Sequence, residues 1–465
     1  MHLFGNISRS DSVNISSATF AHSLYYQFIG DEVSTSVSIQ NSTFSNIVLS
    51  EVFQAKIFVY DSFLNAQLAY NVENSHIQLL NTSVSSKLVS ILENSILLLN
   101  TSLINTKEPL IEFAIEESII LITNSTVTSE LFVLHLKDAS TLRAFDSVFT
   151  QNVFSLEIHS ISVEFENCSL TFELFSEDLH CMRLRFHGCV LRNVSQMAQF
   201  LEESTVIFND SRVINSSDMQ LFKQIENSVF FARQTHFLNV NSSSNLITDN
   251  SFNLKLELKQ CIFENINMQK KENGGLVGSL IGFFIIQNIA LINVNIQCES
   301  QCGTIAGELY ASGRAFDVAI SGSLTGNVSG ALFGIRRTSV TVEVEKVQLF
   351  TETCTQEEVE KYHEEMIIDN VTETFQIITQ FEDLPDGYID IECIKIRQKE
   401  ADEESEEQEK QEQKYDDYQS FYKQFEFARF YQYCKKNQSF TINDQKQTNI
   451  IGEDEVEGDG LTITN

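Results

Sequence analysis

Three aspartates recur at equivalent places in the sequence and are the first candidates for chemistry. Asp61, Asp146 and Asp210 each follow a short apolar alternation and precede a serine. Carboxylates on adjacent repeats could act as general acid and base on a glycosidic bond, or could hold a divalent cation. These three lie four and three repeats apart, which is about 19 Å and 14 Å if the repeats stack at the spacing of paired strands. We therefore expect no catalytic residue and no metal ligand among them.

Nine cysteines are the second candidates. None belongs to a C-x-x-C pair, so we expect no structural zinc and no cofactor. Cys168 and Cys189 stand at the same place in successive repeats, where they could be bridged or could serve as inert small side chains, and we favour the second. The odd number of cysteines also argues against a full disulfide framework.

Fourteen N-x-S/T sequons indicate a secreted glycoprotein. Five of them coincide with a repeated turn position, where a structural preference for Asn followed by Ser or Thr creates sequons by itself. The other nine keep the secretory interpretation open. The candidate N-glycosylation sites are Asn6, Asn14, Asn193, Asn215, Asn241, Asn327, Asn370 and Asn437.

One repeated phrase positions the three aspartates and part of the cysteines and sequons. It has apolar residues four and two places before a turn residue, a small residue directly after it, and an apolar residue three places after it. Residues 74–103 show the phrase twice, as NSHIQLLNTSV and NSILLLNTSL, and twelve copies follow one another about 22 residues apart. Asn and Asp tolerate left-handed backbone and dominate the turn position. This turn ladder comprises Asn41, Asp61, Asn81, Asn100, Asn124, Asp146, Asn167 and Asp210.

Alternation with a period of two predicts strands, and apolar faces that recur once per repeat share a core only if the chain coils and stacks them. We therefore predict an all-β fold, a parallel β-helix solenoid. Two prolines and no tryptophan in 465 residues agree, because proline removes a hydrogen bond from a central strand. The pattern resembles the right-handed parallel β-helix of the pectate-lyase-like superfamily over roughly residues 10–350.

That resemblance implies a protein that acts on polysaccharides, through calcium-binding aspartates or paired carboxylates. His187-Gly188 resembles the His-Gly step of polygalacturonases, but Gly188 falls on the turn position. The other polygalacturonase motifs, Asn-Thr-Asp, Asp-Asp and Arg-Ile-Lys, are missing from the repeats. We therefore expect no enzymatic activity.

Composition divides the chain into four regions: 1–265 with regular coils, 266–350 with Gly-rich coils, 351–400, and 401–465. The Gly-rich region repeats the form G-x-φ-φ-G, where φ is apolar, in Gly274–Gly278, Gly303–Gly307 and Gly330–Gly334. It resembles the GLUG repeat of extracellular β-helical and adhesin-like proteins. Together the first two regions predict about fifteen coils.

The last two regions predict a smaller acidic α+β part. Residues 351–465 carry 30 acidic and 11 basic residues. A short helix is predicted at 356–366, and a β-hairpin about the turn 384–387. Residues 401–465 predict an acidic helix with an aromatic stripe, followed by a disordered tail.

A net charge of −33 argues against nucleic acid and anionic membranes as partners, and no apolar run is long enough to span a bilayer. Residues 1–12 contain neither a secretory signal nor a capping helix, so we expect the sequence to begin inside a longer secreted chain; the alternative is an intracellular protein.

We predict a non-catalytic, elongated surface, adhesion or scaffold protein, at the cell surface or outside the cell, with an unidentified protein or glycan ligand. The alternatives are a carbohydrate-acting or carbohydrate-binding β-helix, and a cytoplasmic interaction protein that recruits partners through its acidic tail.

Overall fold

The structure is a computed structural model. It describes residues 7–8, 12–20, 27–29, 36–45, 49–106, 108–128, 136–137, 140–151, 158–159, 161–171, 174–270, 272–325, 328–330, 332–336, 340–351 and 389–395. The predicted helix at 356–366 and the whole of 401–465 lie outside these residues.

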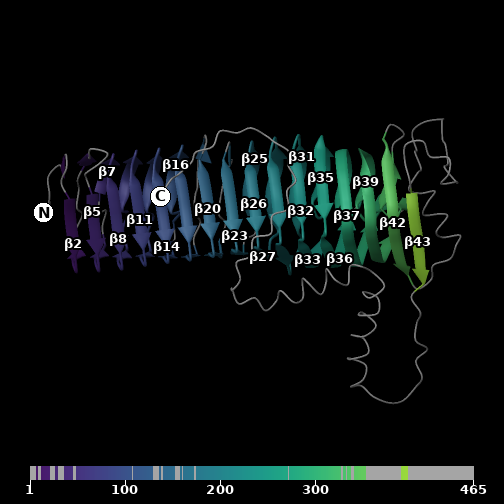
Figure 1. The fold of residues 1–465 in the computed structure, drawn as a ribbon, viewed down its shortest axis with the longest axis horizontal. Helices are drawn as coiled ribbons and strands as arrows, with labels where there is room; N and C mark the ends of the chain where they lie inside the picture. The colour runs from purple at the N-terminus through teal and green to yellow at the C-terminus, as the bar shows by residue number, and fades with distance from the viewer. Residues whose placement is uncertain are drawn as a thin grey trace, which may run out of the picture. The chain divides into compact units, whose positions relative to one another are not determined.

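The described residues form a parallel β-helix, as the repeats predicted. Every strand pairing among them is parallel, and each strand from β1 to β34 pairs with the strand three places further along the chain. Each coil of the solenoid therefore contributes one strand to each of three columns. Figure 1 shows the strands side by side along the long axis of the solenoid, from β2 to β43.

The three columns have these bounds. The first column contains β1 (Ile7–Ser8), β4 (Gln27–Ile29), β7 (Leu49–Phe53), β10 (Ala69–Glu73), β13 (Val89–Glu93), β16 (Ile111–Glu116), β19 (Leu136–Lys137), β22 (Ile158–His159), β25 (Leu174–His180), β28 (Gln196–Glu202), β31 (Gln220–Glu226) and β34 (Thr248–Phe252). The second contains β2 (Ser12–Ser16), β5 (Ser36–Gln40), β8 (Lys56–Tyr60), β11 (His76–Leu80), β14 (Ile96–Asn100), β17 (Ile119–Thr123), β20 (Thr141–Phe145), β23 (Ser162–Glu166), β26 (Arg183–His187), β29 (Thr205–Asn209), β32 (Val229–Arg233) and β35 (Leu254–Lys259). The third contains β3 (Thr19–Phe20), β6 (Thr43–Phe44), β9 (Phe63–Leu64), β12 (Ser83–Val84), β15 (Leu103–Ile104), β18 (Thr126–Val127), β21 (Val148–Phe149), β24 (Ser169–Thr171), β27 (Val190–Arg192), β30 (Arg212–Ile214), β33 (His236–Ser242) and β36 (Ile262–Lys270).

Longer strands replace the three short ones in the Gly-rich region. They are β37 (Val277–Cys298), β39 (Ala306–Thr325), β41 (Phe333–Arg336) and β42 (Val342–Thr351), and a separate pair is formed by β38 (Gln301–Gly303) and β40 (Val328–Gly330). Strand β43 (Ile389–Lys395) pairs in parallel with β42. The other strand of the predicted hairpin lies outside the described residues.

The number of coils differs from the prediction. The twelve strands of each column are joined by about 11 turns of the solenoid, where the repeats predicted about fifteen coils. Counting one short strand per repeat does not hold from residue 277 onward, because β37 and β39 have 22 and 20 residues and run through places where earlier coils have corners. Parts of the predicted coils at both ends also lie outside the described residues.

The interior is filled by the inward-facing residues of all three columns. Ile77 and Leu79 of β11 are fully buried, and the equivalent positions of the neighbouring coils are buried aliphatic residues. Further along, Phe186 stacks between Phe165 and Phe208, with ring centroids 5.5 Å and 4.8 Å away. Removing apolar surface from water stabilises the stack of coils by about 25 cal/mol for each Å² buried. Each stacked aromatic pair adds ~1 kcal/mol.

Buried hydroxyls join the coils at the corners. The Oγ of Ser75 donates to the carbonyl of Glu73 at 2.7 Å and accepts the N–H of Ala55, one coil earlier, at 3.0 Å. Ser95 accepts the N–H of Ser75 in the same way, and Ser118 accepts that of Ser95. Because the chain bends at these corners, the N–H groups of Ala55, Ser75 and Ser95 donate to serine hydroxyls and not to carbonyls of a neighbouring strand. These hydrogen bonds avoid the free-energy cost of burying an N–H group without a partner.

Within the described part of the chain, no helix is long and apolar enough to cross a membrane.

Candidate interaction surface

The predicted turn ladder lies at the corner between the second and third columns. Seven of its eight residues have positive φ, between 47° and 53°. Asn81 Nδ2 donates to Asp61 Oδ1 on the preceding coil at 2.7 Å, so part of this column is hydrogen-bonded between coils. Asp61, Asp146 and Asp210 follow β8, β20 and β29, which places them four and three coils apart. The described residues contain no group of three or more His, Cys, Asp or Glu side chains placed to hold a metal ion.

Asn100 is the exception in the turn ladder. It is the last residue of β14 and pairs in register with Leu80, so the left-handed residue of this coil is Thr101, with φ 50°. The buried small residue is then Ser102 and not Thr101. Residues 96–99 read Ile-Leu-Leu-Leu and are apolar on both faces of the strand, so alternation could not fix the register. The Asn-Thr-Ser phrase that begins at Asn100 is therefore shifted by one residue relative to the phrase that begins at Asn81 on the preceding coil.

Cys168, Cys189 and Cys261 occupy the buried position directly after the turn residue, and none of the three is in a disulfide. The Sγ of Cys189 donates to the carbonyls of Phe165 and His187 at 3.3 Å and 3.4 Å, as the serine hydroxyls of this column do. A hydrogen bond with Cys168, together with burial, raises the pKa of Cys189 far above its ordinary value. Cys189 therefore remains a neutral thiol with a packing role.

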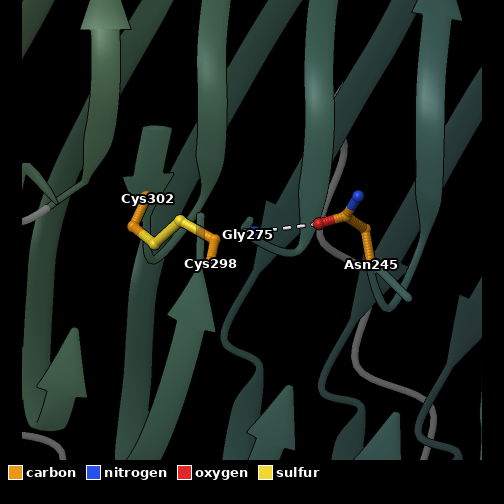
Figure 2. Close-up of a disulfide and its surroundings, with 4 residues drawn as sticks. All are labelled: Asn245, Gly275, Cys298 and Cys302. Atoms are coloured by element: carbon orange, nitrogen blue, oxygen red, sulfur yellow. Dashed lines mark hydrogen bonds between the residues drawn. A yellow bond between two sulfur atoms is a disulfide. The ribbon is translucent and has the colours of Figure 1, made fainter. Parts of the chain in front are cut away.

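A disulfide between Cys298 and Cys302 closes the corner after β37, with the two Cα atoms 6.0 Å apart (Figure 2). The sequence analysis missed this pair, because a separation of four residues across a tight corner gives no repeat signal. Near it, Asn245 is 1% exposed, and its Oδ1 accepts the N–H of Gly275 at 3.0 Å. The two corners of neighbouring coils are thus tied together by a buried amide.

Asn245 is also part of a polar cluster with Asp249 and Lys270. Asp249 Oδ1 accepts hydrogen bonds from Asn245 Nδ2 and from Lys270 Nζ, both at 2.8 Å. Burial by itself would raise the pKa of Asp249. The hydrogen bonds and the positive charge of Lys270 outweigh this effect and hold the pKa of Asp249 below its ordinary value. The cluster is therefore an ion pair at neutral pH.

Apolar side chains face outward on four neighbouring strands of the second column. Ile96 and Ile119 are 37% and 47% exposed and are partners in register on adjacent coils. The rings of Phe58 and Tyr60 stack on each other on β8, two coils before β14, with centroids 6.2 Å apart, and Gln78 of β11 lies between Phe58 and Leu98. We call this surface the apolar flank; it comprises Phe58, Tyr60, Leu80, Ile96, Leu98, Ile119 and Leu121.

Sequence reasoning did not separate the apolar flank from the core. A strand that is buried on one face only should alternate, and the unbroken apolar runs at 96–99 and 119–122 break that rule. Those runs are the signal that could have revealed an apolar outer face.

Four candidate glycosylation sites lie among the described residues, and Asn14, Asn193, Asn215 and Asn241 are all exposed. Asn6, Asn327, Asn370 and Asn437 lie outside them. Asn215, directly after β30, and Asn241, near the end of β33, each begin a ladder of asparagines. The Oδ1 atoms of Asn215 and Asn241 accept hydrogen bonds from Nδ2 of Asn239 and Asn267, both at 3.1 Å. These contacts do not use Nδ2, the atom to which a glycan would be attached.

The two ladders continue along the solenoid. Asn265 and Asn293 extend the first, and Asn267 and Asn295 extend the second, with donor–acceptor distances between 2.9 Å and 3.1 Å. An Asn-x-Asn repeat at 239–241, 265–267 and 293–295 is the sequence signal for them, which the turn-ladder analysis did not use.

Comparison of the chain with models of protein families, with curated proteins and with solved structures found no match. The parallel β-solenoid is the class that the structure defines. The resemblances to the pectate-lyase-like superfamily and to the GLUG repeat rest on the repeat pattern alone.

The Asp249 cluster predicts a pH-dependent contribution to stability. The folded-state pKa of Asp249 lies below its unfolded value of about 3.9, so its contribution is fully present above about pH 4 and is lost as the pH falls through the folded-state pKa. Asp249→Asn should lower the free energy of unfolding by about 1 kcal/mol at neutral pH, because the bond to Lys270 loses its charge. Chemical unfolding at several pH values should show this difference shrinking below about pH 4.

The control is Asp218→Asn, which makes the same chemical change at an exposed aspartate on the surface. It should change the free energy of unfolding by less than about 0.5 kcal/mol at neutral pH. A difference for Asp249→Asn that is independent of pH would contradict the ion pair.

Proposed function

We propose that this protein is a non-catalytic, elongated binding protein with a surface, adhesion or scaffolding role, and that it binds through the outward face of its second strand column. The observation that carries the proposal is the apolar flank. Contiguous exposed apolar residues on a soluble surface mark interaction sites, and a solenoid offers such residues on a long, regular face.

The arrangement of the flank supports contact with a macromolecule. Its residues come from four successive coils, so the surface extends about 14 Å along the solenoid axis at the spacing of paired strands. The side chains are held by strands whose opposite faces are fully buried, as Leu97 and Leu99 show on β14. A rigid face of this kind loses little conformational entropy when it is covered.

The carbohydrate-acting alternative has weaker support. It needs carboxylates that converge from neighbouring coils, and the aspartates of the turn ladder are at least three coils apart. The non-catalytic proposal therefore remains the better supported one.

We also infer that the protein is extracellular or lies at the cell surface. The exposed sequons at Asn193 and Asn215 support this, as does the disulfide between Cys298 and Cys302, because disulfides persist in oxidising compartments. An adhesion role fits such a location.

The flank proposal is tested by the double variant Ile96→Thr, Ile119→Thr, which keeps β-branched residues in both strands. If the flank binds a partner on the producing cell, the fraction of protein retained on washed cells should fall about tenfold, since two partly buried isoleucines contribute about 1.4 kcal/mol. The matched control is Phe200→Thr, Phe252→Thr, which removes exposed apolar residues from the first column (39% and 57% exposed). Equal retention of wild type and both variants would reject the flank as the binding surface.

The location is tested by glycopeptide mass spectrometry and thiol labelling of protein from its native cell. We expect glycans at Asn193 or Asn215, a bare Asn81, whose Nδ2 donates to Asp61, and Cys298 and Cys302 protected from alkylation. A chain without glycans in which Cys298 and Cys302 react as free thiols would contradict the secretory location.

A further inference from the structure

Five arginines gather on the second and third columns in the middle of the solenoid, away from the apolar flank. We call this surface the arginine flank; it comprises Arg183 and Arg185 on β26, Arg192 on β27, Arg212 on β30 and Arg233 on β32. All five side chains are on outward-facing positions of three successive coils. The coils stack at about 4.8 Å, so the arginines span about 10 Å along the axis.

This surface is unusual for a chain with a net charge of −33. The same coils carry Glu202 and Glu226 on the first column, and the acidic residues that border the arginines are Glu164 and Glu257 on the adjacent coils and Asp210 at the corner after β29. Arg185 pairs with Glu164 at 3.1 Å. Among the described residues, Arg183, Arg192 and Arg233 are exposed and have no acidic partner.

Apolar residues lie between the arginines. Ile207 on β29 and Phe231 on β32 are partners in register and face outward, and Ile214 on β30 pairs with Arg192. All three are partly exposed. Arginine and aromatic side chains together are enriched where proteins bind proteins, and arginine binds carboxylates through two parallel hydrogen bonds.

We propose that the arginine flank binds an acidic segment of a partner protein, one in which apolar residues alternate with carboxylates. This inference rests on the proposed use of the solenoid flanks for binding and assigns a partner chemistry to a second stretch of them. Carboxylates of the segment pair with Arg183, Arg192 and Arg233, and its apolar side chains cover Ile207 and Phe231.

The observations favour a peptide segment over a long polyanion. A sulfated glycan or a nucleic acid has no apolar side chains to cover Ile207 and Phe231, and a long polymer would extend beyond the flank over acidic surface. The repulsion there is screened only beyond about 8 Å at physiological ionic strength. A short segment can cover the arginines and meet few carboxylates, chiefly Asp210 and Glu257.

The test uses the full chain at physiological ionic strength and three labelled probes in fluorescence anisotropy. The probes are a short peptide of glutamates and leucines, a peptide of equal charge with serine in place of leucine, and a heparin-derived oligosaccharide. We expect the leucine peptide to bind about tenfold more tightly than the serine peptide, because its leucines cover apolar surface. Phe231→Ser should remove that difference.

Charge dependence is tested with Arg183→Gln, Arg233→Gln, which should weaken binding of the leucine peptide at least tenfold. The matched control is Arg314→Gln, an exposed arginine on β39 outside the flank, which should leave binding unchanged. Thermal unfolding of each variant checks that the exposed substitutions leave the fold intact.

Three results would overturn the inference: the oligosaccharide binds as tightly as the leucine peptide with the same arginine dependence, the two peptides bind equally, or no probe binds. The apolar-flank variant Ile96→Thr, Ile119→Thr separates this inference from the proposed function. If that variant loses cell retention while no peptide binds, only the arginine flank fails. If peptides bind but retention does not change, only the apolar flank fails.

Discussion

The fold depends on one constraint that recurs at most corners on either side of the second column: a residue with left-handed backbone, in most cases followed by a small buried side chain. The left-handed residue turns the chain, and the buried hydroxyl or thiol then bonds the carbonyl two residues before it, as Ser75 does to Glu73 and Cys189 does to His187. The serine also accepts a backbone N–H of the preceding coil. Because strand side chains alternate with a period of two, this corner decides which residues of the next strand enter the core.

The same constraint leaves the outward positions open to other chemistry. Residues such as Ile119 and Arg183 are not needed for packing, so their types vary along the solenoid while the inward residues remain apolar. Apolar, basic and asparagine-rich surfaces therefore occur on one regular scaffold. This division between inward and outward positions supports a binding role for the flanks.

The strands, their parallel stacking and most of the corner positions could be predicted from the sequence, because alternation and Asn or Asp at the turns repeat through twelve copies. The prediction was wrong where a local sequence satisfies two registers, as at Asn100, and where strands lengthen through a corner, as in β37. The disulfide and the apolar flank were missed for a different reason. Contacts across a corner and apolar residues on an outer face are tertiary properties that a one-dimensional repeat does not report.

The most direct test of this account compares Leu97→Ala with Leu98→Ala, which make the same chemical change at neighbouring positions of β14. Leu97 is fully buried, whereas Leu98 faces outward beside Leu121. With the corner at Thr101, Leu97→Ala should lower the free energy of unfolding by about 2–5 kcal/mol, and Leu98→Ala by less than about 1 kcal/mol. Chemical unfolding of the two variants measures both values. The reverse order would place the corner at Asn100 and contradict the register on which the whole description depends.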